Sequence, residues 1–117
     1  MTTTELGQFG ENIAARFLIE NGFHILERNF RFKKGEIDII AEVNDFLVVI
    51  EVKTRQTAEI GEPWRAVTRA KQRQIIQVAN NYIQSSQIIK NARFDIVSIV
   101  TNSYRTSIEH ITDAFYA

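Results

Sequence analysis

The sequence predicts an α/β fold in which helices flank a mixed β-sheet. Apolar residues recur with the periodicity of a helix, three strands, a second helix and two more strands, in that order. The run Phe46–Ile50 is apolar on both faces, which is typical of a central strand covered from both sides. At roughly 100–200 residues per domain, the 117 residues are expected to form a single domain over residues 1–117.

A first helix is expected over Glu5–Glu20. Thr2 and Glu5 fit a capping box, in which each side chain accepts a hydrogen bond from the other residue's backbone N–H. Apolar residues follow at helical spacing, and an Asn-Gly pair after the stripe indicates the end of the helix, because glycine readily adopts the left-handed conformation there. Glu11 falls on the flank of the apolar stripe.

The next three segments are expected to be extended. A strand, or a strand with a loop, is predicted over Phe23–Phe32. Two β-rich runs, Glu36–Val43 and Phe46–Lys53, follow on either side of the short polar Asn-Asp pair, and this pattern predicts an antiparallel hairpin.

The second half of the chain predicts a helix and two strands. Pro63 suits the first position of a helix that runs to about Ser85. Strands are expected over Arg93–Val100 and Tyr104–Ile111, with a polar turn between them.

Composition excludes several classes of site. The absence of cysteine rules out a disulfide scaffold, a thiolate zinc site and a cysteine nucleophile, and the two histidines, His24 and His110, argue against a histidine-based metal cage. The longest apolar run is too short to cross a bilayer, and the N-terminus lacks the features of a secretory signal, so we expect a soluble cytoplasmic protein with no membrane partner. Lys+Arg 14 and Asp+Glu 14 cancel, so a nucleic-acid role requires local clusters of basic residues.

The hairpin places two carboxylates together. If the Asn-Asp pair closes it, facing residues have numbers that sum to 89, and Asp38 faces Glu51. Residues opposite one another on antiparallel strands point to one face with Cβ atoms about 4.5–5.5 Å apart. Alternation puts Lys53 on the face of Glu51.

Like charges in this position are unfavourable, and three arrangements relieve them: a raised pKa on one carboxyl, a basic neighbour, or a divalent cation. Two carboxylates suit Mg²⁺ or Mn²⁺, and a lysine beside the ion can position water or stabilise charge on a phosphate. The alternative is an ordinary surface salt bridge worth about 0–1 kcal/mol. The metal interpretation is favoured because Glu51 and Lys53 directly follow the apolar run, where charge is costly without a partner.

These residues also match a known pattern. The stretch Gly35-Glu-Ile-Asp38, followed after twelve residues by Glu51-Val-Lys53-Thr-Arg55, resembles the signature of the PD-(D/E)XK nuclease superfamily. Over nearly its whole length the chain is similar to the YraN family of small bacterial proteins, which is related to archaeal Holliday-junction resolvases. Further matches are Gly7-x-x-Gly10-Glu11, Arg28-Asn29, Ala66-Val67 before Lys71, Arg93-Phe94-Asp95 and Ala114-Phe115.

The resemblance implies a restriction-endonuclease-like αβββαβ core with a mixed central sheet flanked by helices. It implies that Asp38 and Glu51 are metal ligands, that Lys53 is the catalytic lysine and that Glu11 is an accessory acid near the metal. The proline that precedes the aspartate in the superfamily is Ile37 here, a departure with little effect on the chemistry. Because the related resolvases cut symmetric junctions as dimers, a homodimer is expected.

Basic residues near the predicted site are candidates for phosphate contacts. Arg65, Arg69 and Arg73 recur every four residues and line one helical face, whereas Lys71 lies off that row toward the site. The alternative is a solvated helix face. Arg55 follows the metal strand, where it could contact phosphate or pair with a nearby glutamate.

The leading hypothesis is a metal-dependent endonuclease that hydrolyses phosphodiester bonds of DNA, with branched DNA as one candidate substrate. Asp38, Glu51 and the Val52 carbonyl hold Mg²⁺ or Mn²⁺ in this hypothesis, and Lys53 assists the attacking water. The second hypothesis is a nucleic-acid-binding module that keeps the nuclease fold without turnover. A protein-interaction domain with no nucleic-acid partner is the third.

Overall fold

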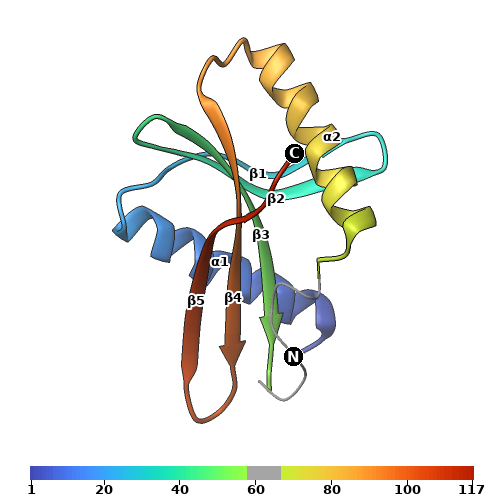
Figure 1. The fold of residues 1–117 in the computed structure, drawn as a ribbon. Helices are drawn as coiled ribbons and strands as arrows, with labels where there is room; N and C mark the ends of the chain where they lie inside the picture. Colours follow the sequence, from blue (N-terminus) through green and yellow to red (C-terminus); the bar gives the residue numbers. More distant parts are fainter. Residues whose placement is uncertain (58–66) are drawn as a thin grey trace.

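Five strands form one mixed sheet with a helix on each face (Figure 1). The computed structural model describes residues 1–57 and 67–117. In chain order the elements are α1 (Thr3–Glu20), β1 (His24–Phe32), β2 (Gly35–Val43), β3 (Phe46–Arg55), α2 (Arg69–Ser86), β4 (Asn91–Thr101) and β5 (Thr106–Phe115). This order confirms the predicted mixed α/β fold, which is compatible with a restriction-endonuclease-like core.

The strands lie in sequence order across the sheet, β1-β2-β3-β4-β5, so β3 is central. Its pairing with β4 is parallel, and the connection between them contains α2, as a parallel crossover requires. The other neighbouring pairs are antiparallel.

The central strand is buried on both faces, as its apolar run predicts. Leu47 and Val49 belong to the cluster that packs under α2, whereas Val48 and Ile50 belong to the cluster that packs under α1. At most 1% of the surface of each of these four residues is exposed. The charged residues that follow in β3 therefore extend from the best-shielded part of the sheet.

Close contact between α1 and β3 depends on Gly10, where a Cβ atom would collide with the side chain of Thr54. The beginning of α1 is fixed by the predicted capping box: Thr2 N donates to Glu5 Oε1 over 2.8 Å, and Glu5 N donates to Thr2 Oγ1 over 3.1 Å. The cap and the close contact together hold Glu11 above the sheet.

Two predicted boundaries were wrong by four residues or more, whereas the others differ by at most two. The expected helix start at Pro63 lies outside the described residues, but Val67 and Thr68 are not helical, and α2 begins at Arg69. Thr68 is the N-cap, since its backbone is extended and its side chain accepts a hydrogen bond from Lys71 N. The last strand runs from residue 106 to residue 115 instead of ending at Ile111. Neither described helix is long and apolar enough to span a bilayer.

Candidate active site

The site begins where the β2–β3 hairpin ladder ends. The register has the predicted sum of 89 from Val43↔Phe46 to Ile39↔Ile50, and a two-residue turn closes it. The next position along β2 is Asp38, where the paired ladder stops. Its Oδ2 accepts a hydrogen bond from Val52 N over 2.8 Å, so this carboxylate binds a backbone donor of β3.

Asp38 and Glu51 interact unfavourably as charged groups. Burial, the negative charge of Glu51 and a hydrogen bond between the two carboxyl groups outweigh the lowering effect of Val52 N, and together they raise the pKa of Asp38 to about 7. The two carboxyl groups, one position beyond the last paired residues of the hairpin, are therefore close enough to share a proton. The same closeness would let them share a cation.

Two lysines surround the other carboxylate of this pair. Only 6% of the Glu51 side chain is exposed, and its Oε2 lies 3.8 Å from Lys53 Nζ and 3.6 Å from Lys71 Nζ. Lys53 lies on the same face of β3 as Glu51, as the alternation along the strand predicts, and Lys71 comes from the first turn of α2. The structure thus brings together an aspartate, a glutamate and two amines from three elements.

Glu11 approaches the same region from α1. It is 9% exposed, and its Oε1 accepts hydrogen bonds from Arg28 Nε over 2.9 Å and Asn29 Nδ2 over 3.1 Å. A hollow of about 240 Å³ is bounded by Glu11, Asp38, Val52, Thr3, Leu6, Gly7 and Thr54. Glu11 and Asp38 thus line a common hollow, although sequence spacing alone left Glu11 at the edge of a helix stripe.

The acidic side chains can hold a metal only with help from other ligands. Within residues 1–57 and 67–117, no three histidine, cysteine, aspartate or glutamate side chains form a metal-binding group. The available donors are the oxygens of Asp38 and Glu51, with the Val52 main chain beside them. This set fits a hard cation such as Mg²⁺, which is usually held by one or two carboxylates and keeps several waters.

The other predicted basic residues are spread more widely. Arg69 and Arg73 are exposed on α2, and Arg55 is half-buried at the end of β3. Arg65 lies outside the part of the chain that the structure describes. Among the predicted phosphate contacts, Lys71 is seen to pair with a carboxylate of the site, Glu51.

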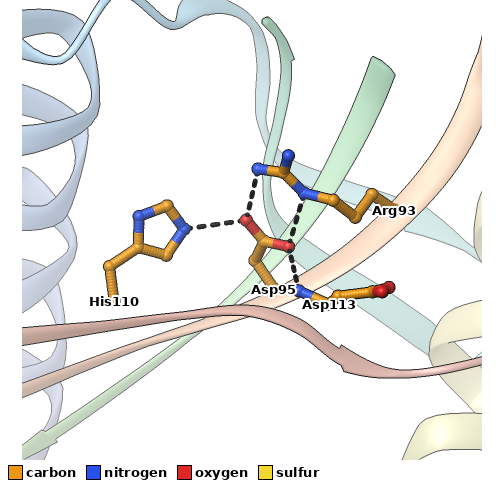
Figure 2. A network of polar contacts seen from close by, with 4 residues as sticks. All are labelled: Arg93, Asp95, His110 and Asp113. Atoms are coloured by element: carbon orange, nitrogen blue, oxygen red, sulfur yellow. Dashed lines mark hydrogen bonds and ion pairs between the residues drawn. The ribbon is translucent and has the colours of Figure 1, made fainter.

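A second polar cluster, shown in Figure 2, lies on β4 and β5. Asp95 is 0% exposed and accepts hydrogen bonds from Arg93 over 2.9 and 3.0 Å and from Asp113 N over 2.9 Å. His110 Nε2 lies 2.7 Å from the same carboxylate. Burial alone would raise the pKa of Asp95, but the hydrogen bonds from His110, Arg93 and Asp113 N together lower it.

This cluster supports the edge of the sheet. The β4–β5 register shifts beside Asp95, and Asp113 in the irregular segment has a positive φ of 56°. Sequence reasoning assigned no chemistry to Asp95. The available signal was a carboxylate within an apolar strand, which requires partners when it is buried.

The sequence matches one described family and many of its members. The family with the description "Uncharacterised protein family UPF0102" matches residues 10–99. A UPF0102 protein of Flavobacterium psychrophilum is 41% identical over 96% of this chain and 94% of its own length. A UPF0102 protein of Clostridium botulinum is 43% identical over 95% of this chain and 93% of its own, and one of Rhodococcus opacus is 45% identical over 94% and 95%.

Proposed function

Since this chain belongs to the UPF0102 family, described as uncharacterised, its activity has to be argued from its own site, and we propose that it is a metal-dependent endonuclease that hydrolyses phosphodiester bonds of DNA. The observation that carries this proposal is the meeting of Asp38 and Glu51 beside Lys53 at the end of a buried strand. Their order and spacing also support a place in the PD-(D/E)XK nuclease superfamily.

Asp38, Glu51 and the Val52 carbonyl are the residues that would hold Mg²⁺ or Mn²⁺. The bound ion would supply positive charge for a phosphate oxygen and would lower the pKa of a coordinated water. A cation also offers an explanation for the carboxyl pair, which the folded chain otherwise keeps at an electrostatic cost.

Lys53 and Lys71 supply the two amines of the reaction. Both lie within 4 Å of Glu51 Oε2, so both can hold a water molecule or a phosphate oxygen at the carboxylate. Lys53 is assigned to the attacking water because it shares the strand of Glu51. Lys71 is assigned to the phosphate because α2 carries it toward the site from above the sheet.

Glu11 is an accessory acid in this proposal. Its carboxylate lines the hollow that contains Asp38 but is held by Arg28 and Asn29, so it can orient a coordinated water through a hydrogen bond. Exposed Arg69 and Arg73 on α2 are assigned to more distant phosphates of the DNA backbone.

The experiment is a cleavage assay on duplex, nicked, single-stranded and four-way branched DNA with Mg²⁺ or Mn²⁺. Asp38→Ala and Lys53→Ala are expected to lose cleavage, whereas Lys34→Ala is the matched control because Lys34 is exposed. Calorimetry is expected to show cation binding by the wild type and the Lys53→Ala variant but not by the Asp38→Ala variant. DNA binding without cleavage of any substrate would instead support a non-catalytic binding module.

A further inference from the structure

A groove on α1 leads away from Asp38. The hollow that contains Asp38 adjoins a second hollow of about 330 Å³, which is bounded by Thr3, Thr4, Gly7, Gln8, Glu11, Arg28 and Asn29. The two hollows share Thr3, Gly7 and Glu11, which follow one another at intervals of four residues along one side of the helix. They therefore form one surface that runs across α1 from the candidate active site to Arg28.

Gly7 is the feature of this groove that packing against residues 1–57 and 67–117 does not explain. A Cβ atom at Gly7 would meet none of the atoms of these residues within 4 Å, and Gly7 lies inside α1 without a positive φ. Glycine is among the least favourable residues in a helix interior, so a side chain would help α1 to form. Gly10 differs because its Cβ would strike Thr54.

The groove is lined by groups that suit a sugar–phosphate backbone. Thr3, Thr4 and Gln8 offer hydroxyl and amide donors, and Arg28 offers a guanidinium that bonds Glu11 Oε1 and Asn12 Oδ1. Neutral donors beside an arginine are typical phosphate contacts of DNA-binding proteins. The ion pair between Arg28 and Glu11 also neutralises the charge of Glu11, which would otherwise repel a phosphate.

We propose that this groove holds the strand of DNA next to the bond that is cut, and that Gly7 lacks a side chain because the sugar–phosphate backbone passes over it. This inference rests on the proposed function and adds the path of the substrate. The strand runs from Asp38 across Gly7 to Gln8 and Arg28.

The test compares Gly7→Leu with Gly7→Ala. Both changes remove an unfavourable helical glycine, so both proteins are expected to melt at or above the temperature of the wild type. Binding of a fluorescent single-stranded oligonucleotide is measured by anisotropy with Ca²⁺ in place of Mg²⁺. Gly7→Leu is expected to weaken binding at least about tenfold by steric exclusion, whereas Gly7→Ala is expected to change it little.

A charge placed in the groove gives a second measurement. Gln8→Glu is expected to weaken oligonucleotide binding, most strongly at low salt, because it puts a negative charge beside the phosphates. Gln84→Glu is the matched control, since Gln84 is exposed near the C-terminal end of α2, outside the groove.

Hydrolysis of a small phosphodiester, bis(p-nitrophenyl) phosphate, separates this inference from the proposed function. The small ester needs the metal site and not the groove, so its hydrolysis by the wild type tests the proposed function without involving the groove. The inference is overturned if Gly7→Leu binds the oligonucleotide as tightly as the wild type does, or if the wild type does not bind it. Binding that depends on Gly7 without hydrolysis of either substrate would support the groove and contradict the proposed function.

Discussion

Replacing Asp38 with asparagine is expected to stabilise the metal-free protein. Burial and the charge of Glu51 raise the pKa of Asp38 from its ordinary 3.8 to about 7. A tenfold change in proton affinity corresponds to about 1.4 kcal/mol, so ionising this carboxyl in the folded chain costs up to about 4 kcal/mol at pH 8. Asparagine removes that charge, and its amide oxygen can still accept the hydrogen bond from Val52 N.

The sign of the pH dependence follows from the two pKa values. Asp38 ionises near pH 4 in the unfolded chain and near pH 7 in the folded chain. The free energy of unfolding of the wild type therefore falls as the pH rises from about 4 to about 7, and above pH 7 its difference from that of Asp38→Asn is constant. Urea unfolding in EDTA is expected to show that the free energy of unfolding of Asp38→Asn exceeds that of the wild type by about 4 kcal/mol at pH 8 and by about half of that or less at pH 5.

Asp45→Asn is the matched control because Asp45 is exposed in the turn of the same hairpin, and its effect is expected to stay within about 0.5 kcal/mol. The reasoning fails if Asp38→Asn has the stability of the wild type at pH 8. It also fails if the gain is equal at both pH values, because the effect would then not come from ionisation.

Three further predictions concern the cluster on β4, the contact under α1 and the lysine from α2. Asp95→Ala leaves the half-buried Arg93 and His110 without their acceptor and is expected to lower the free energy of unfolding in urea by about 3–5 kcal/mol. The folded protein lowers the pKa of Asp95, so this carboxylate stabilises the fold fully above its ordinary pKa and ceases to do so as acid protonates it. The difference in the free energy of unfolding between Asp95→Ala and the wild type is therefore expected to become smaller in acid. Gly10→Ala is expected to lower the free energy of unfolding by about 1–3 kcal/mol, and the added change Thr54→Ala should recover part of this loss. Lys71→Met removes one cation beside Glu51, so calorimetry is expected to show tighter Mg²⁺ binding while DNA cleavage falls.

The hairpin could be predicted because local rules determine it. A two-residue polar turn between two β-rich runs fixes the register, and the register fixes which side chains face one another. That arithmetic predicts that Asp38 faces Glu51, and the structure brings their carboxyl groups together one position beyond the last paired residues. The raised pKa of Asp38 did not follow, because it depends on burial by other elements of the fold.

The start of α2 and the position of Glu11 depend on information that short patterns lack. Pro63 and Thr68 are both residues that favour a helix start, and periodicity does not choose between them. Glu11 is buried because α1 comes close to the sheet at Gly10 and because Arg28 reaches it from β1. Both contacts join segments that are distant in sequence.

Two aspartates of the same sheet, fully buried Asp95 and half-buried Asp38, show how the fold separates structural from functional charge. Asp95 is fully buried, yet its partners compensate for the burial and the pKa falls below its ordinary value. Asp38 accepts a hydrogen bond from Val52 N and lies beside the carboxyl group of Glu51, and its pKa rises to about 7. Arg93 forms an ion pair with Asp95, whereas the ion pairs seen at the Asp38–Glu51 pair join Lys53 and Lys71 to Glu51. A carboxyl kept under this electrostatic cost is better explained by a ligand that relieves the cost than by a contribution to folding, and an ion shared with Glu51 would relieve both carboxylates at once.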